Sequence, residues 1–117
     1  MPLPKYTPSS FSTAVQHSWS EAQYYPPEVV AYAAAIALDT SLVNSKVKTT
    51  LTGNTTVTVS NGVEGQELVY IFTQDGTGSR TVSWSGVSGT PSTITSTANS
   101  VSIAYMERLA AGWAFIG

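Results

Sequence analysis

The 117-residue chain contains no cysteine and very little charge. Without cysteine there is no disulfide framework, no thiolate zinc site and no thiol nucleophile. Charged residues make up 10% of the sequence, with five Lys and Arg against seven Asp and Glu, whereas soluble domains average about 25%. Five basic residues are too few for the positive stripe that meets phosphates in nucleic-acid binding. We therefore expect no nucleic-acid partner.

Long hydrophobic runs are also missing. The longest one, Val29–Leu38, is about half as long as a membrane-spanning helix must be. The first residues, Met1–Pro4, lack the charged segment and apolar core that open a signal peptide. We therefore expect no membrane partner and no secretory leader.

Serine and threonine take the place of charged residues. A surface so poor in charge has little protection against association. Such a surface suits a protein that other subunits partly cover. A polar β-surface built from Thr and Ser in a free protein would have the same composition, so the two interpretations stay open at this point.

Residues 1–28 differ from the rest of the chain because they hold five of the six prolines and five of the twelve aromatic residues. Proline fixes φ and removes an amide donor, which favours extended backbone. A disordered tail is usually rich in charge and poor in aromatics, which is the reverse of this segment. We predict an extended arm whose aromatic side chains contact a partner: Tyr6, Phe11, Trp19, Tyr24 and Tyr25.

Residues 29–117 have the pattern of short β-strands separated by turns. Alternating or fully apolar stretches recur about every ten residues, which is typical of an antiparallel β-sandwich or barrel. Asn61-Gly62 is a strong turn signal, because both residues accept a positive φ. The expected strands lie at 46–52, 55–60, 68–72, 80–84, 101–105 and 113–115, with Val47, Leu51, Trp84 and Trp113 facing inward.

The segment Pro26–Leu38 is ambiguous. Pro27, Glu28 and the alanines that follow could begin a helix. Val29-Val30 and the alternation of Ile36 and Leu38 favour a strand instead. Local propensity leaves both structures open.

No catalytic or metal-binding pattern stands out, so we expect neither an enzyme nor a cofactor. His17 is the single histidine, and no nucleophile elbow accompanies it. Glu64 and Glu67 could form a carboxylate pair for glycoside hydrolysis, but their spacing on a strand favours opposite faces, and the solvated interpretation is preferred.

The turn after the 68–72 strand is predicted to be structural. Asp75 lacks the series of oxygen ligands that a calcium loop needs. Its carboxylate can instead accept hydrogen bonds from the amides of its own turn. Gly76 and Gly78 supply the positive φ that so tight a reversal requires, and Arg80 then lies where it can reach an acidic neighbour.

The sequence from about residue 35 to 117 resembles a β-domain found in structural proteins of tailed bacteriophages, in fibres, spikes and capsid decoration proteins. The resemblance lies in Ile36–Asp39, Leu51–Thr56, Gly65-Gln66, Phe72–Val82 with Trp84, and Ser96–Asn99, and its most specific part is Thr73–Thr81. It implies a homotrimeric, all-β virion component and favours a strand at 35–39. It does not extend to the arm.

Together these features predict a capsid decoration (cement) protein on the capsid exterior. In this interpretation a homotrimer binds the major capsid protein through the arm and stabilises the joints between capsomers. The alternative is a small tail or fibre component, or a glycan-binding module, that takes part in host attachment. A hydrolase is the weakest of the alternatives, because no active site is recognisable.

Overall fold

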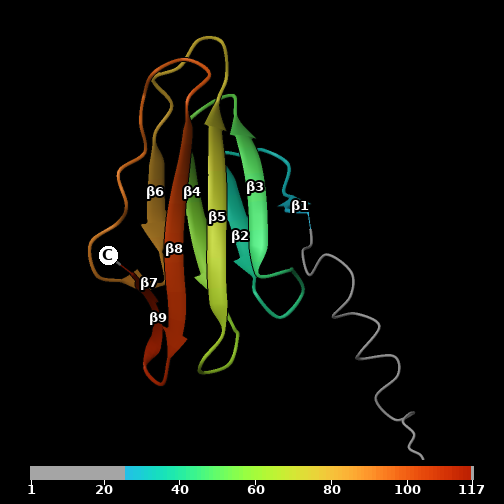
Figure 1. The fold of residues 1–117 in the computed structure, drawn as a ribbon, viewed down its shortest axis with the longest axis vertical. Coiled ribbons are helices and arrows are strands. Elements are labelled where there is room, and N and C mark those ends of the chain that lie inside the picture. The colour runs from blue at the N-terminus through green and yellow to red at the C-terminus, as the bar shows by residue number, and fades with distance from the viewer. Residues whose placement is uncertain (1–25, 117) are drawn as a thin grey trace, which may run out of the picture.

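The computed structural model describes residues 26–116, in which every regular element is a β-strand (Figure 1). A six-stranded sheet has the order β1-β3-β5-β8-β9-β7, and a three-stranded sheet has the order β2-β4-β6. The strands are β1 (Glu28–Val29), β2 (Ala35–Asp39), β3 (Lys46–Leu51), β4 (Thr55–Ser60), β5 (Glu67–Gln74), β6 (Val82–Ser85), β7 (Val87–Ser88), β8 (Val101–Leu109) and β9 (Gly112–Phe115). The all-β class is confirmed, and the two sheets form a sandwich-like arrangement.

The first six strands alternate between the two sheets. β1, β3 and β5 pair in parallel in one sheet, and β2, β4 and β6 pair in parallel in the other. The chain therefore coils through both sheets, as in a β-solenoid. The antiparallel pairing expected from the sequence occurs only where β8 lies between β5 and β9. For the other strand pairs that prediction is wrong.

The turn at Asn61-Gly62 shows why the pairing was misread. Both residues have positive φ, 62° and 89°, as the sequence predicts. They do not join two strands of one hairpin, however, but carry the chain from β4 in one sheet to β5 in the other. A Cβ on Gly62 would lie 2.7 Å from Thr40 Oγ1 and 2.9 Å from the Trp113 ring, so the turn packs against the core.

The ambiguous segment contains strands and no helix. β1 takes Glu28–Val29 and β2 takes Ala35–Asp39, with irregular chain between them. Ile36 and Leu38 are buried, and their neighbours in β2 face outward. Tertiary pairing of β2 with β4 thus decides what local propensity left open. No helix in residues 26–116 is long and apolar enough to cross a membrane.

The core lies between the two sheets. It is formed by alternate residues of the long strands, as the pleat of a strand requires. Trp113 is buried, whereas Trp84 is only half-buried against the same cluster. The buried hydrophobic residues are Ile36, Leu38, Val47, Leu51, Val57, Val59, Leu68, Tyr70, Phe72, Ala104, Met106 and Trp113.

Two aromatic rings of β5 determine what β8 can place in the core. The rings of Tyr70 and Phe72 stack with their centroids 4.2 Å apart. Ala104 and Ser102 lie directly opposite them on β8. The large rings fill the space between the sheets, so β8 contributes small side chains opposite them. Met106, which lies opposite Leu68, is also buried, and Val101, Ile103 and Tyr105 point to the outer face.

Candidate functional site

An exposed apolar surface covers the outer side of β5 and β8. We call it the outer apolar face, and it consists of Val69, Ile71, Val101, Ile103 and Tyr105. The three β8 residues are 58%, 39% and 49% exposed, and the two β5 residues are half-buried. The alternation of Val101, Ile103 and Tyr105 was recognisable in the sequence, but their exposure to solvent was not.

The outer apolar face is ordered in rows across three strands that lie side by side in Figure 1. Val69 lies between Lys46 on β3 and Tyr105 on β8, and Ile71 lies between Lys48 and Ile103. Both lysines are exposed. The face therefore has a basic border along β3, beyond which Val29 of β1, 70% exposed, lies level with Lys48.

A carboxylate pair closes one end of this surface. Glu67 on β5 lies directly opposite Glu107 on β8, in the row next to Val69 and Tyr105. Glu67 is exposed and Glu107 is half-buried. Glu67 thus borders the apolar face, and it pairs in register with Glu107, not with Glu64. Among residues 26–116 no group of three or more His, Cys, Asp and Glu side chains could hold a metal ion.

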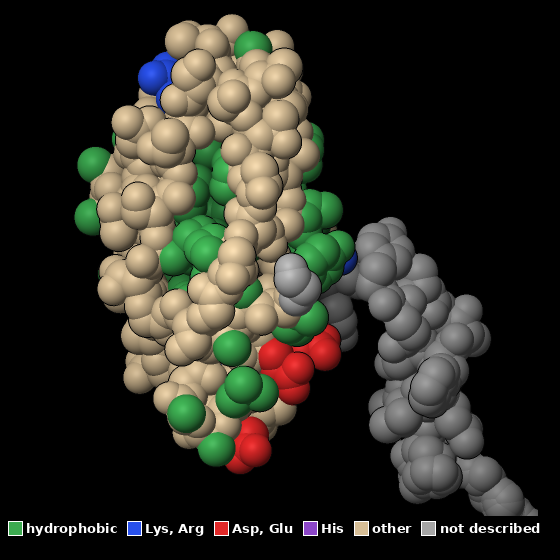
Figure 2. Space-filling view, turned by 90° about the vertical axis from the view of Figure 1, so that its left-hand side faces the viewer, with side chains coloured by type: hydrophobic (Ala, Val, Ile, Leu, Met, Phe, Trp, Pro, Cys, Tyr) green, Lys and Arg blue, Asp and Glu red, His purple; other side chains and the backbone are tan. Residues whose placement is uncertain are grey.

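A second set of hydrophobic side chains is visible at the edge where β6, β7 and β9 lie. Figure 2 shows them between two polar margins of the molecule. Val82, Trp84 and Phe115 are partly buried against the core, and the rings of Trp84 and Phe115 meet edge to face with centroids 5.1 Å apart. Trp84 Nε1 is buried and has no hydrogen-bond partner among residues 26–116. Trp113 is buried and offers no ring to a sugar.

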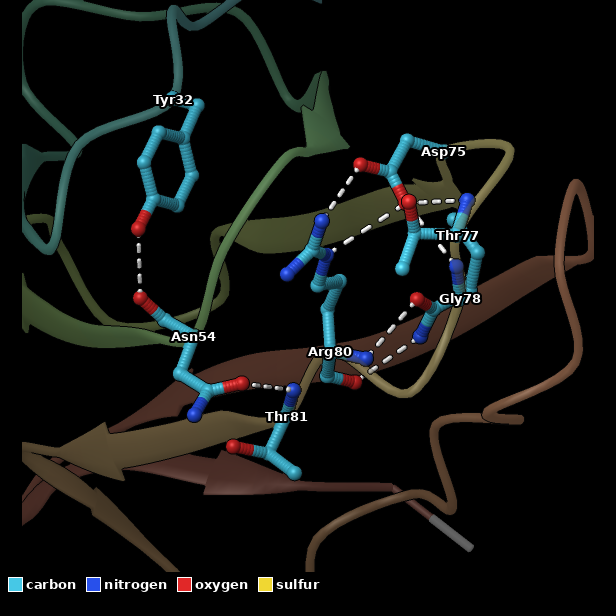
Figure 3. Close-up of polar contacts among 8 residues, drawn as sticks. Tyr32, Asn54, Asp75, Thr77, Gly78, Arg80 and Thr81 are labelled. Atoms are coloured by element: carbon cyan, nitrogen blue, oxygen red, sulfur yellow. Dashed lines mark hydrogen bonds and ion pairs between the residues drawn. The ribbon is translucent and has the colours of Figure 1, made fainter.

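The turn that contains Asp75 is held by its own hydrogen bonds (Figure 3). Asp75 Oδ1 accepts from the amides of Thr77 at 3.1 Å and Gly78 at 3.0 Å. Its Oδ2 accepts from Arg80 Nη2 at 2.9 Å. The Arg80 side chain, followed by the Gly78 amide, lowers the pKa of Asp75 below its ordinary value. The carboxylate is thus an ionised acceptor within the turn.

Side chains on either side of the turn tie it to the neighbouring strands. Gln74 Oε1 accepts from the Arg80 amide at 3.1 Å, and its Nε2 donates to Arg80 O at 2.9 Å and to Thr95 O at 2.9 Å. Asn54 Oδ1 accepts from the Thr81 amide at 3.0 Å, and Tyr32 donates its hydroxyl to Asn54 O at 2.8 Å (Figure 3). Gln74 is buried, so its polar atoms need these partners.

The sequence suggests positive φ at Gly76 and Gly78, whereas the structure has it at Gly78 and Ser79. Gly78 has φ 73° and Ser79 has φ 61°. A Cβ on Gly78 would lie 2.7 Å from Ser96 O and 2.8 Å from Ala98 N, whereas nothing lies within 4 Å of a Cβ on Gly76, whose φ is not in the positive range. The expectation that Gly76 is needed for a positive φ is therefore wrong. Gly78 carries that requirement.

The aromatic residues predicted to contact a partner lie outside the described residues, as does the lone histidine. This applies to Tyr6, Phe11, Trp19, Tyr24, Tyr25 and His17. Their role stays a prediction. The division into an arm at 1–28 and a β-domain at 29–117 also stays a prediction.

Residues 26–116 thus form an all-β domain that coils through two sheets and presents an apolar outer face. Comparison with protein families matches residues 35–108 to the family described as "Putative phage tail fibre C-terminal domain". The match covers more than half of the chain, and the chain belongs to this family. No curated protein and no solved structure gives a significant match. The chain is therefore a bacteriophage structural protein associated with the virion.

Proposed function

We propose that the chain is a component of a bacteriophage tail fibre, in which it forms a homotrimer and takes part in attachment to the host cell. The observation that carries this proposal is the family match over residues 35–108. That range begins with β2 and ends within β8, so it includes the parallel pairing of β3 with β5, that of β2, β4 and β6, and the outer apolar face. The family supports the fibre alternative better than the capsid decoration role that the sequence favoured.

The proposal assigns no catalysis to the chain. Two carboxylates of the described residues, Asp39 and Asp75, act as acceptors in turns. Asp39 Oδ1 accepts from the Ser41 hydroxyl at 2.6 Å and from the Ser41 amide at 3.0 Å. Hydrogen bonds, first from Ser41 and then from Asn61, lower the pKa of Asp39, just as Arg80 lowers that of Asp75. A general acid needs the opposite shift to hold its proton at neutral pH.

Immunogold electron microscopy of intact phage particles tests the location. Antibodies raised against the purified chain are expected to label the tail and its fibres. Antibodies against the major capsid protein serve as the control for labelling of the shell. Gold particles spread evenly over the capsid would instead support the decoration role and contradict the fibre proposal.

Adsorption to host cells tests the attachment part of the proposal. The purified chain, added in excess before the phage, is expected to lower the fraction of phage that adsorbs, because it competes for the same surface. An equal excess of heat-denatured chain is the control. Unchanged adsorption with a folded, trimeric chain would contradict a role in attachment.

A further inference from the structure

We propose that copies of this chain pack against one another through the outer apolar face, with the strands of all copies pointing in the same direction and with Lys46 of one copy facing Glu107 of the next. The inference rests on the homotrimer of the proposed function and adds its contact surface and its orientation.

The two outer surfaces of the domain differ sharply in chemistry. On the three-stranded sheet the outward residues of β4 and β6 are all Thr or Ser and are exposed: Thr56, Thr58, Ser60, Ser83 and Ser85. On the six-stranded sheet the outward residues of β8 are Val101, Ile103 and Tyr105. An antiparallel or mixed sheet that faces water normally presents polar residues there. The outward apolar residues of β2 are only the small Ala35 and Ala37. The large outward apolar side chains of these strands thus lie on one side of the domain, where contact with another protein surface would remove them from water.

The packing of the core does not require apolar residues on the outside of β8. Tyr70 and Phe72 account for the small inward residues Ala104 and Ser102, but Thr or Ser at positions 101 and 103 would leave that packing unchanged. An exposed aliphatic side chain contributes favourable free energy only when another surface covers it and removes it from water. The choice of Val and Ile therefore points to a covering partner.

The charges around the face match a second copy of the same chain. Glu67 and Glu107 lie directly opposite each other, an arrangement that is unfavourable for like charges. Within residues 26–116 the ion pair is that of Arg80 with Asp75. Glu67 and Glu107 therefore have no basic partner within the described part of the chain. The exposed Lys46 and Lys48 form the opposite border of the same face. A neighbouring copy would bring its basic border to this acidic end.

The positions of these charges along the strands favour a parallel arrangement of the copies. Lys46 is level with Val69 and Tyr105, and Glu107 is two residues further along β8 from Tyr105, a rise of about 7 Å. Rotation about an axis parallel to the strands leaves the position of every residue along the strand direction unchanged. Lys46 of one copy therefore comes within side-chain reach of the Glu107 carboxylate of the next copy. A two-fold axis across the strands, placed at the middle of the face between the rows of Val69 and Ile71, would instead bring the glutamates to the row of Thr50, Thr73 and Val101, which has no basic side chain.

Sedimentation of the full chain tests the surface. The wild-type chain is expected at about three chain masses, and Ile103→Asp is expected to shift it to one chain mass. The matched control is Leu42→Asp, because Leu42 is 77% exposed and lies outside the face; it should leave the assembly unchanged. Circular dichroism should show that both variants keep the β-fold. Persistence of the trimer in Ile103→Asp overturns the proposal. A monomeric wild-type chain also overturns it, and this is the result expected if residues 1–25 covered the face of their own chain.

Charge reversal tests the orientation independently of folding, because both side chains lie on the outer surface. Lys46→Glu and Glu107→Lys should each raise the dissociation constant about tenfold, and the double variant should restore it, because the pair is then rebuilt with exchanged signs. Additive losses in the double variant overturn the parallel arrangement. Gold labelling of the capsid would contradict the fibre assignment without affecting these results, whereas a trimer that persists in Ile103→Asp would overturn the contact surface without affecting the fibre assignment.

Discussion

Replacing Gly78 with alanine should destabilise the fold much more than replacing Gly76, although both glycines belong to the Asp75 turn. In Gly78→Ala the new Cβ meets two backbone atoms, Ser96 O at 2.7 Å and Ala98 N at 2.8 Å, and it does so at φ 73°. In Gly76→Ala the Cβ points into open space at an ordinary φ. The two residues share one turn, but Gly76 is exposed and Gly78 is buried, so the comparison sets an open position against one that combines backbone strain with close contact.

The magnitude follows from the two costs at Gly78. Left-handed backbone costs a residue with a Cβ about 1–2 kcal/mol. Displacing the backbone around Ser96 and Ala98 costs about 1–3 kcal/mol, as overpacking does elsewhere. Gly78→Ala should therefore lower the free energy of unfolding by about 2–5 kcal/mol. Gly76→Ala should leave it within about 1 kcal/mol and can raise it, because alanine restricts the unfolded chain.

Urea denaturation followed by circular dichroism measures both variants. The midpoint of Gly78→Ala should fall clearly below that of the wild type, and its melting temperature should drop by at least about 8 °C, since each kcal/mol corresponds to about 4–8 °C in a domain of this size. Equal destabilisation by Gly76→Ala and Gly78→Ala would refute the reasoning, because the turn would then not depend on its positive φ.

Two further predictions concern acid stability and the tryptophans. The pKa of Asp75 is lowered in the folded state by Arg80 and the turn amides, so the ionised carboxylate contributes its full stability above the ordinary value of 3.8 and loses it as the pH falls through the lowered value. In Asp75→Asn the urea midpoint should therefore depend less on pH below about 4 than it does in the wild type. The same pH dependence in both proteins would contradict this. Trp113→Phe removes the hydrogen bond from Nε1 to Asn61 O at 2.9 Å, whereas Trp84 Nε1 has no partner to lose in the part of the chain that the structure describes. Trp113→Phe should therefore lower the free energy of unfolding by about 0.5–1.5 kcal/mol more than Trp84→Phe, and a larger loss at Trp84 would be the contrary result.

The sequence predicts which residues of a strand face the core better than it predicts which strands pair with one another. Thr55–Ser60 forms β4 as expected, with Val57 and Val59 inward, because alternation directly encodes which side of a strand is buried. Alternation carries no information about the partner strand. An Asn-Gly turn fits a hairpin and a crossing between sheets equally well, and the parallel ladders were missed for that reason.

The outer apolar face was missed for a different physical reason. In β8, hydrophobicity alone would bury Val101, Ile103 and Tyr105, yet Ser102, Ala104 and Met106 are the buried residues. The decision depends on the volume already taken by Tyr70 and Phe72 across the sheet, which becomes known only once the pairing is known. Residues 1–25 carry the predicted partner contacts, and that prediction is independent of the fold.

The alternation of β1 to β6 between two sheets also has a consequence for how the chain folds. Ala35 pairs with Thr56 and Lys46 pairs with Val69, so each parallel ladder closes only after the intervening strand has crossed to the other sheet. Neither sheet can form on its own, and each new coil needs the previous one as its template. Folding should therefore be slow and strongly cooperative, because loops must close before the contacts that stabilise them exist. β8 then adds an antiparallel strand to β5, so this domain reaches its stable state only after β8 has left the ribosome.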